Sequence, residues 1–437
     1  MLSFILSCGS MMVVREMWGE FLVMMMLLTG IFLMNSSDNL MWKISFLGEM
    51  DYISWSLTGL SFWVVMLSVL GSVMVKKNLL RYMFLMFNMA LLISFLVSFY
   101  VSDFMFFYLG FESCLVPIFF LILGWGYQPE RIEAGVYMLM YTVFGSLPLF
   151  FLILWMKKSG SSYMYWQMFM SGSSFFFYVF LMGAFLVKFP MYGVHLWLLK
   201  AHVEAPVAGS MLLAGVMLKL GGYGMIRFLP FWESSPEKVK DVIMILSLWG
   251  GFMVSLTCLR QMDMKLLIAS SSVVHMSMCI GGLLVMSEWG MKGSVFLMVG
   301  HGLCSSGLFF LANIVYLRTG SRSMTVSKGF LNVMPSMSLV WFLLVVCNMG
   351  SPPSLNLLGE ILIISTLVNW SYLSVILIAF LSFFGACYSI YLFSLSQHGK
   401  YVKVISGSDS GKSLEYLICM GHWLPLNMII LSIFCLG

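Results

Sequence analysis

Apolar residues run along this chain in long stretches rather than alternating with polar ones. Between Val207 and Ile226, for example, the only charged side chain is Lys219. About 20 apolar residues span the core of a bilayer, and a helix satisfies its own backbone hydrogen bonds there. The pattern therefore predicts an all-α membrane protein, folded as one polytopic membrane domain over residues 1–437.

A window of about 19 residues divides the chain into about 14 predicted transmembrane helices. One stretch, 333–370, is too long for a single span, and the sequence Gly350-Ser-Pro-Pro353 interrupts it. Proline removes a backbone donor and clashes with the preceding turn, so a broken helix is expected there. The predicted spans lie near residues 1–14, 18–34, 55–75, 82–101, 104–123, 134–156, 175–199, 207–229, 242–259, 266–286, 292–317, 333–370, 372–395 and 416–436.

The spacing of these spans predicts an internal symmetry. Residues 82–229 and 242–395 each hold about five spans, and the fourth span of each block carries a proline interruption, at Pro190 and at Pro352-Pro353. An odd number of spans inverts the second copy in the membrane. Paired broken helices in inverted repeats are typical of a transport site near the bilayer midplane.

Positive residues concentrate in alternate loops, namely those after the third, fifth, ninth, eleventh and thirteenth predicted spans. Positive loops stay on the negative side of a membrane, so these loops are predicted on that side and both chain ends on the other. The residues that set this orientation are Lys76, Lys77, Arg81, Arg131, Arg260, Lys265, Arg318, Arg322, Lys328, Lys400, Lys403 and Lys412.

Composition excludes several classes of protein. Only 9% of residues are charged, whereas a soluble domain carries about 25%. The net charge of +5 comes without a basic run of the nucleic-acid-binding kind, so no nucleic-acid partner is expected. The nine cysteines form no C-x-x-C pair, which argues against iron–sulfur, zinc and disulfide frameworks.

Two further features bear on origin. The first positive residue is Arg15, so no signal or transit peptide is expected at the N-terminus. The 42 methionines have two interpretations. One is compositional drift, because Met replaces Ile and Leu readily in apolar packing; the other is translation in an organelle whose genetic code reads an extra codon as Met.

Four charged residues lie well inside predicted spans rather than near their ends, and inside a span each costs about 2.5–3.5 kcal/mol on insertion scales. Such residues face protein or water and mark ion paths. The alternative is a structural ion pair between helices, for example Glu112 with Lys188. The four are Glu112, Lys188, Lys219 and Glu360.

Histidines accompany these charges, and a group that titrates near pH 6.5 can pass protons. His195 and His202 are seven positions apart and share a helix face if the helix continues. The alternatives are polar links between helices or a haem held by two facing histidines. Glu204 belongs to the polar stretch 200–206, which is predicted at the membrane edge or a cavity wall. Four of the six histidines are meant, namely His195, His202, His275 and His301.

Nucleotide and metal motifs are missing from the sequence. It has no G-x-G-x-x-G after a strand, no Walker motif and no metal-ligand cluster. No cofactor, metal or redox centre is therefore expected on this chain.

Residues 187–210, VKFPMYGVHLWLLKAHVEAPVAGS, closely resemble the signature of the subunit 4 family of mitochondrial NADH:ubiquinone oxidoreductase (complex I). Further stretches are similar to the family in the family's order, from about residue 100 to 395, and the resemblance is weak at both ends. They are 126–131, 145–148, 218–224, 259–263, 301–306 and 352–360.

The resemblance implies an antiporter-like, proton-pumping subunit of the complex I membrane arm, a translocase in the mitochondrial inner membrane. It implies that Glu112 pairs with Lys188, that Lys219 is the central relay, that His275 and His301 bridge the middle, and that Glu360 leads toward the exit. NADH, FMN, the iron–sulfur clusters and ubiquinone would sit on other subunits. The partners would be other membrane-arm subunits, the lipid bilayer and protons.

The chain departs from the family pattern at three positions. Leu199 stands where the family usually has Pro, which changes a helix end. Ser270 and Val274 stand where Tyr and Ser are expected before His275, so the hydroxyls beside the implied relay differ.

Two other functions compete with a redox-driven proton pump. One is a cation/proton antiporter subunit of the related multi-subunit type. The other is a structural membrane subunit whose buried charges are inert. The KAHVEAP sequence at 200–206 and the methionine content favour the mitochondrial proton-pump subunit.

Overall fold

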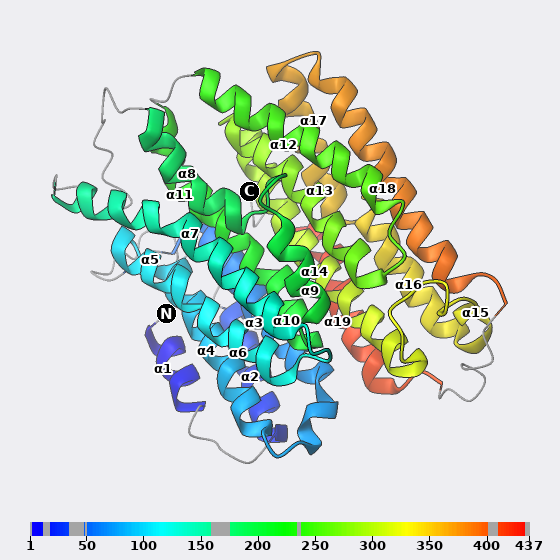
Figure 1. Ribbon diagram of the computed structural model, residues 1–437. Coiled ribbons are helices and arrows are strands. Elements are labelled where there is room, and N and C mark those ends of the chain that lie inside the picture. The colour runs from blue at the N-terminus through cyan, green and yellow to red at the C-terminus, as the bar shows by residue number, and fades with distance from the viewer. Residues whose placement is uncertain are drawn as a thin grey trace. The chain divides into compact units, whose positions relative to one another are not determined.

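The structure is a computed structural model that describes residues 2–11, 18–34, 48, 50–158, 175–233, 237–400 and 410–432 (Figure 1). Within these ranges the chain is helical, and its only extended pairing is two isolated bridges, Gly48 with Val101 and Asp263 with Ser323. The predicted all-α class is confirmed.

The helices group into two compact units. The first contains Met1–Pro190 and Glu204–Asp241, and the second contains Met191–Val203 and Val242–Gly437. The segment Met191–Val203 thus belongs to the second unit although the chain on either side of it belongs to the first.

The first unit is built largely from apolar helices. Asp103 illustrates how a helix begins, because its carboxylate accepts a hydrogen bond from the Met105 amide at 3.3 Å. The helices are α1 (Leu2–Met11), α2 (Trp18–Met34), α3 (Tyr52–Gly71), α4 (Arg81–Tyr100), α5 (Phe104–Ser113), α6 (Leu115–Trp125), α7 (Arg131–Lys158), α8 (Phe175–Lys188), α10 (Val207–Leu212) and α11 (Leu218–Glu233). A 3-10 turn, Val73–Lys77, follows α3, and a π-helical turn, Leu213–Met217, joins α10 to α11.

The second unit is arranged around one long buried helix, α14 (Glu288–Thr319), against which α13, α16, α17 and α19 pack (Figure 1). The other helices are α9 (Leu196–Glu204), α12 (Glu237–Cys258), α13 (Met264–Leu284), α15 (Phe330–Val333), α16 (Pro335–Asn348), α17 (Leu355–Trp370), α18 (Ser374–Gln397) and α19 (Ser413–Met428), with a 3-10 turn at Ile429–Ser432. The first turns of α12 and the last residue of α9 fall in the first unit.

Glycine allows α14 and α17 to approach closely. A Cβ on Gly359 would lie 2.7 Å from the Leu297 amide nitrogen, and one on Gly300 would lie 2.2 Å from the Asn356 side-chain oxygen. Small residues at helix interfaces permit such backbone contact in membrane proteins. The α17 residues that follow the break are thereby held against α14.

Among the described residues, ten helices are long and apolar enough to cross a membrane, and four further apolar helices are shorter. The predicted breaks are present, because α8 ends at Lys188 before α9 begins at Leu196, and α16 ends at Asn348 before α17 begins at Leu355. The total of about 14 spans, the single domain and the inverted repeats over 82–229 and 242–395 stay predictions.

Helix ends differ from the predicted ones at several places. The third span runs over Tyr52–Gly71 rather than 55–75. The prediction that Lys265 is a loop charge was wrong, because α13 begins at Met264, and Lys265 is buried and donates to the Val203 carbonyl at 3.3 Å. It is not one of the exposed positive charges that indicate orientation.

Candidate functional site

In the first unit, Lys188 and Glu112 meet where two helices are interrupted. Lys188 is the last residue of α8, and Glu112 lies next to the end of α5, just before the chain turns into α6. The Lys188 ammonium lies 3.8 Å from the Glu112 carboxylate and is 2% exposed, while Glu112 is 19% exposed. The predicted pair is therefore present as a geometric contact.

Two other groups help to hold the buried ammonium. Lys188 Nζ donates to the Phe111 carbonyl and lies 3.1 Å from the centroid of the Phe111 ring. An aromatic face and a carbonyl dipole both attract a cation removed from water. Lys188 thus has polar contacts besides the carboxylate, and the pair can exchange a proton without leaving a bare buried charge.

Lys219 is the second residue of α11 and lies two positions after the π-helical turn. Its side chain is fully buried, and Nζ donates to the Ala214 carbonyl, which lies in that turn, at 2.6 Å. Short π-helical segments inside helices occur frequently at functional sites. A buried, protonatable amine is therefore held against the turn.

Gly221 brings α11 against the break that follows Lys188. A Cβ at this position would lie 2.7 Å from the Phe189 amide nitrogen. The interrupted end of α8 and the helix that carries Lys219 therefore pack backbone to backbone, which places both lysines in the same part of the first unit.

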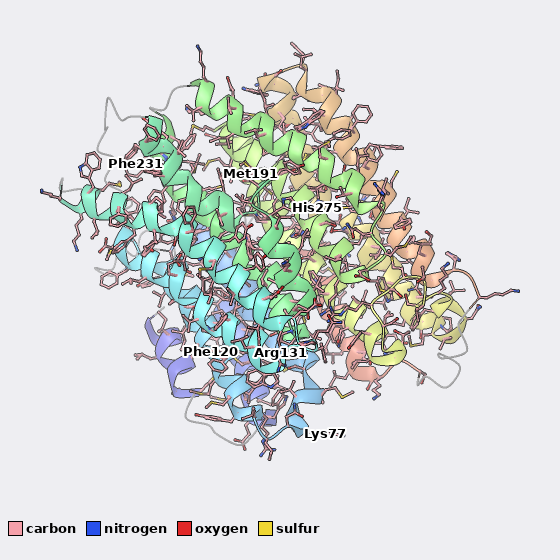
Figure 2. The ribbon with its side chains drawn as sticks, viewed as in Figure 1. Lys77, Phe120, Arg131, Met191, Phe231 and His275 are labelled. Carbon is pink, nitrogen blue, oxygen red and sulfur yellow. The ribbon has the colours of Figure 1, made fainter. Side chains whose placement is uncertain are left out.

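In the second unit, His275, His301 and Glu360 come together from α13, α14 and α17 (Figure 2 labels His275). His275 Nδ1 lies 3.5 Å from the Glu360 carboxylate, and the ring centroids of the two histidines lie 5.4 Å apart. Both rings are buried. His275 thus contacts both Glu360 and His301, and imidazole and carboxylate groups so placed can accept, hold and release protons.

The polar stretch around α9 is split between the units. His195 precedes the first turn of α9 and stacks on Tyr192, with ring centroids 5.6 Å apart. His202 is fully buried in α9 and stacks on Phe309 at 4.7 Å. The condition that the helix continues is not met at His195, because residues 192–195 form a turn. Glu204 is buried at the end of α9, in the first unit.

Two of the positions that depart from the family pattern, Ser270 and Val274, precede His275 on α13. Ser270 is buried and donates to the Leu266 carbonyl at 2.9 Å, back toward its own helix, and Val274 is buried and apolar. The Ser270 hydroxyl is therefore not directed at His275, and Val274 has no hydroxyl.

Tyr388 was missed by the sequence reasoning. It lies on α18, is fully buried, and its hydroxyl lies 3.2 Å from His275 Nε2. Tyrosine is enriched where membrane helices meet water, so a tyrosine in a predicted span does not by itself indicate a functional residue.

His422 was also missed. It is buried on α19, and its Nδ1 lies 3.1 Å from the Ser306 hydroxyl on α14. A histidine inside the predicted span 416–436 was the sequence feature that could have identified it.

The described residues contain no group of three or more His, Cys, Asp or Glu side chains that could hold a metal ion. The candidate relay groups are the Lys188–Glu112 pair, Lys219 with its backbone acceptor, and the His275–Glu360 contact. This arrangement suits proton transfer between neighbouring groups.

Gly350, in the break between α16 and α17, makes room for the Glu360 carboxylate. Its φ is +76°, and a Cβ there would lie 2.5 Å from Glu360 Oε2. We expect Gly350→Ala to displace this carboxylate from His275 and to lower proton pumping severalfold, because a left-handed alanine also adds about 1–2 kcal/mol of strain. The measurement is proton uptake per electron in assembled complex.

Gly320→Ala is the matched control. Gly320 has φ +68° in the same unit, but a Cβ there would meet nothing within 4 Å. It carries similar backbone strain without touching the carboxylate. Equal losses of pumping in both variants would mean that strain, not displacement of Glu360, is responsible.

Two sequence families match the chain. The family described as "NADH:quinone oxidoreductase/Mrp antiporter, TM" matches residues 101–385, and "NADH-ubiquinone oxidoreductase chain 4, amino terminus" matches residues 1–99. Proteins named NADH-ubiquinone oxidoreductase chain 4 are similar along most of their length. The one from Ceratitis capitata is 51% identical over 407 residues, covering 92% of this chain and 90% of the relative, and the one from Aedes aegypti is 49% identical over 415 residues, covering 94% and 93%.

Solved structures share the fold at low sequence identity. A chain of respiratory complex I from Thermus thermophilus has a TM-score of 0.86 and 20% identity, over 98% of this chain and 95% of that chain. A chain of the Mrp complex from Dietzia sp. has a TM-score of 0.82 and 18% identity, over 99% of this chain and 50% of that chain. Both likenesses concern the helical architecture.

Proposed function

Since this chain belongs to the NADH-ubiquinone oxidoreductase chain 4 family, we propose that it conducts protons through buried acid–base groups in both of its units. It is an antiporter-like subunit of the proton-translocating NADH:ubiquinone oxidoreductase. The groups are Glu112, Lys188 and Lys219 in the first unit and His275, His301 and Glu360 in the second. His195, His202 and Glu204 are further candidates, from the polar segment that lies between Lys188 and Lys219 in sequence.

One observation carries the proposal. Each unit holds buried protonatable side chains at an interrupted helix, with Lys188 3.8 Å from Glu112 and His275 3.5 Å from Glu360. A buried charge is costly unless it has partners, and a partner that can share a proton lowers the barrier to moving it. Interrupted helices supply the free backbone groups that such sites use.

The cellular setting is part of the same proposal. The chain would lie in the mitochondrial inner membrane against lipid and against other membrane-arm subunits of complex I. NADH, FMN, the iron–sulfur clusters and ubiquinone would be bound by other subunits, with no cofactor here. The redox energy would then reach these side chains through changes in protein conformation and charge.

The second candidate is a cation/proton antiporter subunit, which the Mrp likeness favours at the level of fold. Purification of the native complex separates the two. Flavin and iron–sulfur spectra in the complex, with NADH-dependent proton uptake, support the respiratory subunit. Cation-driven proton exchange without those spectra would replace it with the antiporter.

The orientation of the chain gives a further prediction. Lys77, at the outer edge of the first unit (Figure 2), follows α3, and Tyr372, 88% exposed, lies between α17 and α18. We expect cysteines placed at these two positions to react with an impermeant thiol reagent from opposite sides, with Lys77 on the matrix side, because positive loops stay on the negative side. The position Gly437, predicted on the side opposite Lys77, lies outside the described residues.

The unmodified complex gives the labelling background for this measurement, since Cys114, Cys258 and most other described cysteines are buried. Reaction of both introduced cysteines from the same side would contradict the predicted number of crossings between them.

A further inference from the structure

His275 contacts a second side chain besides Glu360, its partner in the proposed proton relay. The Tyr388 hydroxyl lies 3.2 Å from Nε2, and Glu360 Oε1 lies 3.5 Å from Nδ1 on the other edge of the ring. Tyr388 reaches this place from α18, while Glu360 comes from α17. The imidazole is therefore held at both nitrogens by groups from two different helices.

These two partners favour the same arrangement of hydrogens. A neutral imidazole has one N–H and one lone pair, and an ionised carboxylate can only accept. Nδ1 then carries the hydrogen toward Glu360, and Nε2 accepts the hydrogen bond that the Tyr388 hydroxyl donates. The hydrogen bond at one ring nitrogen determines which nitrogen is protonated.

The phenol also suits the charged form of the ring. When His275 takes up a proton, both nitrogens become donors, and the Tyr388 hydroxyl can rotate to accept from Nε2. A buried imidazolium N–H without an acceptor would cost about as much as a lost hydrogen bond to a charged group. One side chain thus serves both protonation states without moving its ring.

We propose that Tyr388 is a positioning residue of the proton relay, which fixes the tautomer and the ring orientation of His275 between Glu360 and His301. This inference rests on the proposed function, since it gives a role to His275 in proton transfer. It also explains how the site keeps a hydroxyl beside the imidazole although Ser270 bonds its own helix and position 274 is valine.

Ring orientation matters because His301 approaches from a third helix. The two histidine rings lie 5.4 Å apart between centroids, with an interplanar angle of 46°. A rotation of the His275 ring by half a turn would exchange its nitrogen and carbon edges and break both contacts. The Tyr388 hydroxyl opposes this rotation on the side where no carboxylate holds the ring.

The test compares Tyr388→Phe with Tyr391→Phe. Tyr391 lies on the same helix, and its hydroxyl donates to Met262 Sδ at 3.7 Å, away from His275. Each variant loses one hydroxyl and keeps its ring, so assembly should be normal in both. We expect Tyr388→Phe to slow proton pumping by about fivefold, which corresponds to the loss of one neutral hydrogen bond, and Tyr391→Phe to pump normally.

Two readouts distinguish positioning from packing. In complex labelled with ¹⁵N-histidine, the infrared bands that distinguish the two imidazole tautomers should change in Tyr388→Phe and not in Tyr391→Phe. Tyr388→Phe should also add no loss to a His275→Asn variant, because residues that act through one group are not additive. An additive loss, or unchanged bands with unchanged pumping, would overturn the role of Tyr388.

Different results would overturn the role of Tyr388 and the proposed function. If His275→Asn abolishes pumping while Tyr388→Phe pumps normally, the relay stands and Tyr388 is only a packing residue. If His275→Asn itself pumps normally in assembled complex, His275 is not part of the relay, and the role of Tyr388 falls with it.

Discussion

Lys219→Arg is expected to assemble into the complex and to lose most proton pumping, nearly as severely as Lys219→Met. A relay lysine has to release its proton and recover it, and a guanidinium keeps its proton at any accessible pH. Lys219 is fully buried, with its ammonium 2.6 Å from the Ala214 carbonyl. Pumping should fall by at least about tenfold, since a positioned acid–base group contributes about 10²-fold or more.

Arginine separates this role from that of a scaffold. A structural cation needs only a permanent positive charge, which arginine supplies with a similar reach, whereas methionine removes it. The amount of assembled complex has to be measured in both variants, because the larger guanidinium has to fit beside the π-helical turn. Near-normal pumping by fully assembled Lys219→Arg would remove Lys219 from the relay.

Glu112→Gln should stall or uncouple the complex, while oxidation of NADH by a water-soluble artificial acceptor continues. Glu112 is the only carboxylate of α5 and α6, and glutamine keeps its size but cannot carry charge or a transferable proton. Lys188 would keep its contacts with the Phe111 ring and carbonyl, so the local fold should survive. The measurements are quinone-linked turnover and proton uptake per electron.

Glu133→Gln is the control for this substitution, since Glu133 is an exposed carboxylate in the first turn of α7. Its loss should leave both rates near normal. If Glu112→Gln also keeps normal quinone-linked turnover and normal pumping, the carboxylate is structural, and the Lys188 pair is an ion pair that only joins two helices.

Proline chemistry made both helix breaks predictable. Pro190 and Pro352-Pro353 favour a helix end, and α8 and α16 end shortly before them. Proline alone is not decisive, because Pro148 lies within α7. The long apolar stretches, which end at charged residues and turns, likewise made the helical class predictable. The free-energy cost of placing a charge inside the membrane identified Glu112, Lys188, Lys219 and Glu360 as candidates. This argument needs no knowledge of the fold.

Other features depend on packing that a pattern does not contain. Tyr388 and His275 are 113 positions apart, and only the meeting of α13 with α18 brings them together. Lys265 was misassigned because a pattern locates a helix start only to within a few residues, and one turn decides whether a lysine is a loop charge or a buried donor. The π-helical turn before Lys219 has no sequence signature that apolar periodicity would reveal.

The membership of α9 in the second unit has a consequence for synthesis. Ribosomes deliver α8 first, then Met191–Val203, and only much later the helix that carries Phe309, on which His202 stacks. Multi-part proteins usually complete their N-terminal part first. Here α9 has to wait for residues made more than a hundred positions later, so the part of the break from Met191 onward cannot reach its final packing during early insertion. A nascent chain halted near residue 241 would hold the helices of the first unit and a short helix still without the neighbours that bury it.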